Sequence, residues 1–146
     1  MDGSALVGTW SLLSFEIFAG VGTARYPYGR APTGYITYTP DGFMCVAVMS
    51  SDRQSFAESE FAGVAGTQEE KARAFDGYLT YSGRYETAGD RVLHRIEVSL
   101  FPNWVGTVIE RTVAFEGDKL ILTGPAVRSG TVSQAVRVVW KRAGTA

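Results

Sequence analysis

Residues 91–107 have the sequence RVLHRIEVSLFPNWVGT, which joins the clearest strand of the chain to its most apolar turn. Alternate positions of this strand differ in character. One set is apolar apart from a histidine, and comprises Val92, His94, Ile96, Val98 and Leu100. The intervening set includes Arg95 and Glu97. This period of two is typical of a half-buried antiparallel strand, so we predict that His94, the only histidine, faces the core.

The turn after this strand has an unusual composition. Residues 100–105 have the sequence LFPNWV and are mostly apolar, whereas turns are normally polar because their backbone must reach solvent. Such a turn must lie against something apolar, which is a core, a lid or a ligand. Phe101, Asn103 and Trp104 are therefore candidate ligand-binding residues at the mouth of a cavity.

Further strands are predicted on both sides of this stretch. The ranges that favour a strand are 6–17, 34–39, 43–49, 78–86, 91–100, 107–115, 119–123 and 133–142. Pro40-Asp41-Gly42 predicts a hairpin turn between the second and third of them. The long connection, Ser50 to Gly77, contains two capping-box patterns, which predict two short helices. The second is expected over residues 68–76, and the insertion is either a lid or a cover for the neighbouring strand.

Eight antiparallel strands with one apolar face each can form a sandwich or a closed barrel. The inward positions favour the barrel, because they include Arg111 on the side opposite Glu110. A lone buried guanidinium is costly, so Arg111 needs a carboxylate or a ligand oxygen as its partner. Glu16 is the candidate carboxylate, although the pattern of residues 6–17 leaves its inward or outward direction open. The predicted fold is all-β, an eight-stranded antiparallel barrel with a short helical insertion between strands 3 and 4.

Length and charge exclude several classes of protein. The chain has 146 residues, which suits a single domain over 1–146, and its formal net charge is −1 with the basic residues scattered. Neither a nucleic-acid partner nor a membrane partner is therefore expected. The one cysteine, Cys45, is expected to be a small buried hydrophobe, and with one histidine it cannot form a zinc site. No leader or long apolar run is seen, so a cytoplasmic location is expected.

Several motifs resemble those of the microbial lipocalin-like domain family. They are Gly8-Thr9-Trp10, Tyr26-Pro27-Tyr28-Gly29, residues 34–42 (GYITYTPDG) and residues 99–106 (SLFPNWVG), and the resemblance spans nearly the whole chain. It implies a calycin-type barrel in which Trp10 closes one end beneath an arginine of the last strand. Arg142 and Arg137 are the two candidates for that arginine.

The resemblance implies two kinds of function, because similar barrels serve both as carriers and as cofactor-free cyclases or isomerases. We expect the barrel to enclose one small, mainly apolar, oxygenated molecule such as a polyketide, a terpenoid or a fatty-acid-like compound. In the enzyme hypothesis the protein cyclises or isomerises that molecule. The alternative is a passive intracellular carrier or sequestering protein. A barrel filled by its own side chains, acting as a protein-interaction module, is the third alternative, and a homodimer is left open.

The candidate site residues follow from the inward faces and from the apolar turn. The candidate catalytic residues are His94, Arg111 and Glu16, since a histidine moves protons near neutral pH and a guanidinium holds a developing oxyanion. The candidate ligand-binding residues are Tyr38, Tyr81, Phe101, Asn103, Trp104 and Trp140. No phosphate-binding glycine motif is present, so nucleotide cofactors are not indicated and no cofactor is expected. With one cysteine and one histidine, no metal is expected either.

Overall fold

The computed structural model describes residues 1–19, 22–129 and 132–144, and within them it contains nine strands and one α-helix. The strands are β1 (Gly8–Ala19), β2 (Ala24–Arg25), β3 (Thr33–Tyr38), β4 (Phe43–Met49), β5 (Tyr78–Ala88), β6 (Arg91–Ser99), β7 (Val108–Glu116), β8 (Lys119–Ser129) and β9 (Val132–Arg142). The helix is α1 (Gln68–Asp76), and three short 3₁₀ turns are η1 (Gly3–Ala5), η2 (Phe61–Gly63) and η3 (Pro102–Trp104).

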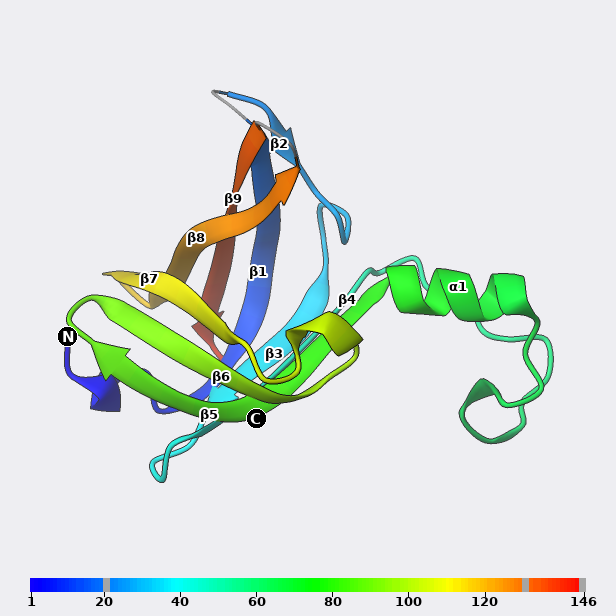
Figure 1. Ribbon diagram of the computed structural model, residues 1–146, viewed down its shortest axis with the longest axis horizontal. Coiled ribbons are helices and arrows are strands. Elements are labelled where there is room, and N and C mark those ends of the chain that lie inside the picture. The colour runs from blue at the N-terminus through cyan, green and yellow to red at the C-terminus, as the bar shows by residue number, and fades with distance from the viewer. Residues whose placement is uncertain (20–21, 130–131, 145–146) are drawn as a thin grey trace.

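Strand β1 closes the sheet into a barrel, because it pairs with β3 along one edge and with β9 along the other (Figure 1). Between these two neighbours the order is β3-β4-β5-β6-β7-β8-β9, and every pair is antiparallel. Eight of the nine strands thus form the barrel, while β2 adds two residues beside the far end of β1. The predicted all-β, closed, eight-stranded antiparallel barrel is confirmed.

The position of the helix corrects the sequence analysis. The insertion was expected between strands 3 and 4, whereas α1 lies after β4 and before β5. The short β2 was not predicted, and it raises the number of every strand that follows it by one. The helix begins at the expected capping box of Thr67 and Glu70 and ends at Gly77. The first predicted helix is replaced by η2, where Ala62 and Gly63 adopt positive φ and prevent a longer helix.

The insertion extends away from the barrel, as Figure 1 shows for α1. In the part of the chain that the structure describes, none of the helices has the length and apolar character needed to cross a membrane.

Strand β6 follows the predicted alternation only as far as Ile96. Val92, His94 and Ile96 are buried, but Val98 is 66% exposed. The reason is a shift of the β5–β6 pairing at Ser82 and Gly83, where β6 has one extra residue. Such a bulge reverses the direction of the side chains that follow it.

The shift brings two backbones unusually close at Gly83. A Cβ atom added there would lie 1.9 Å from the carbonyl oxygen of Arg95, so glycine is required.

On β4 the alternation is regular, with Met44, Val46 and Val48 buried. Cys45, between two of them, is therefore exposed on the outer face, which corrects the expectation that it is buried.

One end of the barrel is closed by Trp10, which is 3% exposed. Its indole nitrogen donates a hydrogen bond to the carbonyl oxygen of Leu6 at 2.9 Å. The guanidinium of Arg142 lies over its ring, 3.9 Å from the centroid, and donates to the carbonyl oxygens of Val7 at 2.6 Å and Ala5 at 2.9 Å. Arg142 is thus the arginine of the last strand that covers Trp10, whereas Arg137 lies opposite Glu16 further along the β1–β9 pair.

We predict that Trp10→Ala destabilises the protein by about 3 to 5 kcal/mol, because it removes a buried tryptophan and leaves a cavity under Arg142. The melting temperature should fall by roughly 10 °C, measured by circular dichroism. Trp104→Ala is the matched control, since Trp104 is only half-buried, and its melting temperature should change much less. An unchanged melting temperature in Trp10→Ala would show that this tryptophan does not support the closed end.

Candidate ligand-binding site

A cavity of about 60 Å³, here called the barrel cavity, lies inside the barrel and has mostly apolar walls. Its aliphatic walls are formed by Ile36, Val46, Val48, Leu79, Leu122 and Val138. The aromatic side chains of Phe15, Trp104 and Trp140 complete the wall, and its polar groups belong to Tyr81, His94 and Arg111. A volume of this size has room for only a few water molecules. Typical ligand pockets are larger, with volumes of roughly 300 to 1,000 Å³.

His94 is held between two tyrosines from neighbouring parts of the barrel. The hydroxyl of Tyr38, on β3, lies 2.8 Å from Nε2, and the hydroxyl of Tyr81, on β5, lies 2.8 Å from Nδ1. His94 is 1% exposed and Tyr38 is also fully buried, while Tyr81 borders the barrel cavity. Period-two alternation on three strands brings these three side chains to the interior.

Burial keeps this group of residues uncharged. Desolvation, with a smaller effect from the Arg111 charge, lowers the pKa of His94 from 6.5 to about 3. Desolvation raises the pKa of Tyr81 to about 12 and raises that of Tyr38 well above its ordinary value. The imidazole is therefore neutral at physiological pH, and so are both phenols.

The neutrality of His94 leaves one hydroxyl hydrogen unused. A neutral imidazole has one N–H donor and one acceptor nitrogen, so one tyrosine donates to the ring and the other accepts from it. Tyr38 is enclosed behind the ring and has no second partner among the described residues, so it is best satisfied by donating to Nε2. Tyr81 then accepts from Nδ1, and its own hydroxyl hydrogen remains available for a partner in the barrel cavity that this residue borders.

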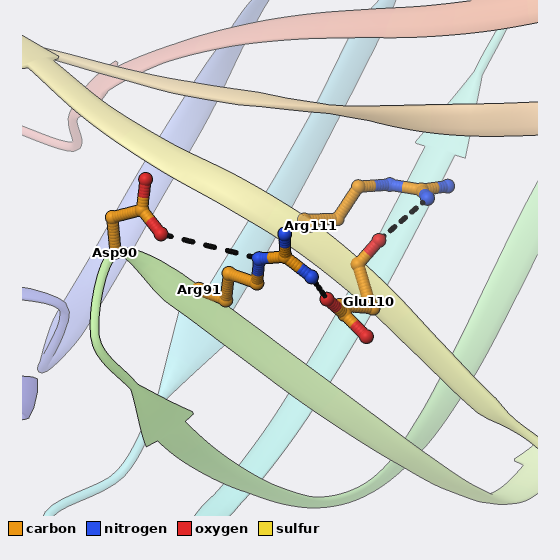
Figure 2. Close-up of polar contacts among 4 residues, drawn as sticks. All are labelled: Asp90, Arg91, Glu110 and Arg111. Atoms are coloured by element: carbon orange, nitrogen blue, oxygen red, sulfur yellow. Dashed lines mark hydrogen bonds and ion pairs between the residues drawn. The ribbon is translucent and has the colours of Figure 1, made fainter.

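Arg111 is the charged residue of the cavity wall. Figure 2 shows its side chain on one side of β7 and the Glu110 carboxylate on the other, where that carboxylate pairs with Arg91. The guanidinium donates to the carbonyl oxygens of Glu110 at 3.1 Å and Pro125 at 3.3 Å.

Gly124 makes room for the Arg111 side chain, a role that no sequence pattern indicated. A Cβ atom at position 124 would lie 3.0 Å from a guanidinium nitrogen of Arg111 and 2.9 Å from the Glu110 carbonyl oxygen.

Trp140 supplies another donor to the same interior. It is 2% exposed and lines the cavity, and its indole nitrogen has no hydrogen-bond partner in the part of the chain that the structure describes. A buried donor without a partner costs free energy unless a ligand or water accepts its hydrogen. The barrel cavity therefore contains hydrogen-bond donors on three strands.

The structure places Glu16 outside this interior. Glu16 does not meet Arg111, because the β1–β9 pairing shifts between Leu12 and Ser14 and reverses the side-chain directions beyond that point. Phe15 and Ile17 pack on the core instead, which turns Glu16 to the outer face of β1.

The residues of the apolar turn lie at the mouth. Trp104 borders the barrel cavity and contacts Tyr81 edge to face, with ring centroids 5.8 Å apart. Phe101, 38% exposed, packs on the other side of Trp104, and Asn103 is exposed.

A second space, here called the outer hollow, adjoins the mouth and has a volume of about 220 Å³. It is lined by Tyr28, Phe75, Phe101 and other residues, and it shares Leu79 and Trp104 with the barrel cavity. These two side chains thus separate the two spaces. Sequence reasoning missed Leu79 and Tyr28, since neither is polar enough or unusual enough in its pattern to stand out.

A larger hollow of about 620 Å³ lies between the turn at residues 26–29, residues 50–56 and α1. It is an open surface depression and includes none of the predicted site residues. The described residues also contain no group of three or more His, Cys, Asp or Glu side chains arranged as metal ligands. The barrel cavity, with its buried and electrostatically perturbed polar groups, is the stronger candidate site.

Comparisons with known proteins find a family match and two similar proteins. A profile of the lipocalin-like domain matches residues 7–143. The 4'-hydroxy-3'-methoxypropiophenone carrier protein ppsC of Aspergillus oryzae is 38% identical over 109 residues, which cover 68% of this chain and 96% of that protein. An uncharacterized protein from Bacteroides eggerthii, known from a crystal structure, aligns with a TM-score of 0.47 at 13% identity over 94% of this chain and 99% of its own.

We predict that His94 makes the folded protein sensitive to acid. The unfolded chain takes up a proton at the ordinary pKa of 6.5, whereas the folded chain resists protonation down to about pH 3. The stability that depends on neutral His94 is therefore complete above pH 6.5 and is lost as the pH falls toward 3.

His94→Gln tests this prediction, because the amide offers a donor and an acceptor to the two tyrosines but does not titrate. Between pH 6.5 and 3, the free energy of unfolding of the wild type should fall more steeply than that of the variant, by at most about 1.4 kcal/mol per pH unit. Urea denaturation at a series of pH values measures both slopes. Parallel slopes would contradict the assignment of a neutral, buried His94.

Proposed function

This chain belongs to the lipocalin-like domain family, and on that premise we propose that it is a carrier for one small, mainly apolar molecule with oxygen acceptors. The observation that carries the proposal is the set of donors in the barrel cavity: Tyr81, Arg111 and Trp140 all offer hydrogens within apolar walls. A ligand with an apolar body and acceptor oxygens satisfies these donors, and it leaves no donor of its own unpaired among aliphatic side chains.

The related carrier suggests the class of ligand. Its name specifies 4'-hydroxy-3'-methoxypropiophenone, which is a flat aromatic ketone with a phenol, a methoxy group and a carbonyl. This chain covers nearly all of that protein at 38% identity, which supports a ligand of the same chemical class. We therefore propose a phenolic aryl ketone or a close analogue as the cargo.

Entry of such a ligand requires the barrel cavity to enlarge. Its volume of about 60 Å³ is too small for an aryl ketone, but the outer hollow of about 220 Å³ lies across Trp104 and Leu79. Joined, the two spaces approach the lower end of the range for ligand pockets. We propose that Trp104, which is carried by the three-residue η3 and not by a strand, moves aside when the ligand binds.

Carriage is favoured over cofactor-free cyclisation or isomerisation by the chemistry of His94. A general acid or base works best with a pKa near the operating pH, but His94 has a pKa of about 3 and the pKa of Tyr81 is about 12. Both groups hold their neutral forms and serve as fixed hydrogen-bond partners. These properties support binding without proton transfer.

We predict that 4'-hydroxy-3'-methoxypropiophenone binds the wild-type protein at one site and is released unchanged. Isothermal titration calorimetry measures the affinity, and mass spectrometry of the recovered ligand measures any conversion. Val138→Phe should weaken binding at least tenfold, because the added ring occupies the barrel cavity. Val98→Phe is the matched control, since Val98 is 66% exposed on the outer surface, and its affinity should equal that of the wild type.

Two results would contradict the carrier proposal. The first is the absence of binding across a panel of aryl ketones and other small oxygenated apolar molecules. The second is a converted product, which would restore the enzyme hypothesis. Equal affinities in Val138→Phe and Val98→Phe would place the ligand outside the barrel cavity.

A further inference from the structure

The positive charge of Arg111 has no ionic partner in the part of the chain that the structure describes. Its hydrogen bonds go to two backbone carbonyl oxygens, which are neutral. The ion pairs of the described residues lie on the outer surface and use Arg84, Arg91 and Arg95. Arginine does not lose its proton in proteins, so this charge persists inside the barrel.

Among the residues that the structure describes, no other strand brings a compensating charge to the cavity. The titratable groups that face Arg111 are Tyr38 on β3, Tyr81 on β5 and His94 on β6. All three are neutral at physiological pH because burial disfavours their charged forms. The remaining strands contribute uncharged side chains to the wall, among them Phe15, Val46, Val48, Leu122, Val138 and Trp140. The described side chains that line the barrel cavity therefore carry one net positive charge.

We propose that the barrel cavity binds its ligand as an anion, with a phenolate oxygen held by the Arg111 guanidinium and the Tyr81 hydroxyl. This inference rests on the proposed carrier function and specifies the ionisation state and the orientation of the cargo. The phenol end of the aryl ketone lies inside, and the ketone end faces η3. The single negative charge neutralises the interior, and in a low dielectric the attraction is much stronger than in water.

The ligand is chemically suited to this role. A phenol with a carbonyl group para to its oxygen is more acidic than tyrosine, whose pKa is about 10, because the carbonyl delocalises the phenolate charge. Its phenolate absorbs at a longer wavelength than its phenol, so the absorption spectrum reports the ionisation state of the bound molecule directly.

The experiment is a spectroscopic pH titration of 4'-hydroxy-3'-methoxypropiophenone, free and bound to excess protein. A cation within about 4 to 6 Å lowers the pKa of an acid by roughly one to three units, so the absorbance midpoint of the bound ligand should fall by that amount. The affinity should accordingly rise with pH between the bound and the free midpoints and stay constant above the free midpoint. The dimethoxy analogue, which cannot ionise, should bind with an affinity that does not change over this range.

Arg111→Met and Arg111→Lys form a matched pair of variants. Methionine removes the charge while keeping an unbranched side chain, so the midpoint of the bound ligand should return to the free value or rise above it. Lysine keeps the charge without the planar guanidinium, so most of the downward shift should remain. Arg111→Met should lose more affinity for the phenolic ketone than for the dimethoxy analogue, because only the phenolate pairs with the charge of the guanidinium.

The outcomes separate this inference from the carrier proposal. If the wild type binds the phenolic ketone but the bound spectrum remains that of the neutral phenol, the carrier proposal stands and the anion inference is wrong. If a downward shift persists in Arg111→Met, another group holds the charge and the assignment to Arg111 is wrong. If neither the phenol nor its ether binds, the carrier proposal itself fails. The wild-type titration and its ether control decide the question even if Arg111→Met does not fold.

Discussion

The structure depends on the pairing of β1 with both β3 and β9, since this double pairing converts a sheet into a closed barrel. Closure removes the sheet edges and creates an interior that water does not freely enter. Trp10 and Arg142 seal one end of that interior, while the opposite end is covered by Trp104 of the short η3 turn. A rigid end and an end formed by a turn are what a container for a small molecule requires.

The interior holds two kinds of polar group, and they respond differently to the low dielectric. The tyrosines and His94 can adopt neutral forms, and the two hydrogen bonds of Tyr38 and Tyr81 to His94 satisfy both ring nitrogens while leaving one hydroxyl hydrogen without a partner. Arg111 cannot become neutral, and its neighbour Glu110 is engaged by Arg91 on the outer surface. Hydrophobic residues at these positions would stabilise an empty barrel better. Their presence is therefore best explained by the ligand that we propose they bind.

The comparisons and the cavity support the same kind of function by independent routes. The related protein is a named carrier, and this chain belongs to the lipocalin-like domain family. The cavity adds chemical detail, because its hydrogen-bond donors suit a ligand with acceptor oxygens. The pKa values of His94 and Tyr81 are far from neutral pH, so neither group is suited to proton transfer there. The proposed function of confinement and release agrees with polar groups that are fixed in place and with our proposal that Trp104, at the mouth, moves aside.

The sequence by itself determined the strands and the inward direction of His94 and Arg111, because period-two alternation within one strand is a local property. Only the tertiary structure decided where that alternation breaks. The shift between Leu12 and Ser14 turns Glu16 outward, and the shift at Ser82 and Gly83 exposes Val98. A bulge arises from the pairing of two strands, which for β1 and β9 come from opposite ends of the chain. One extra residue reverses every side chain that follows it, so its position cannot be obtained from either strand alone.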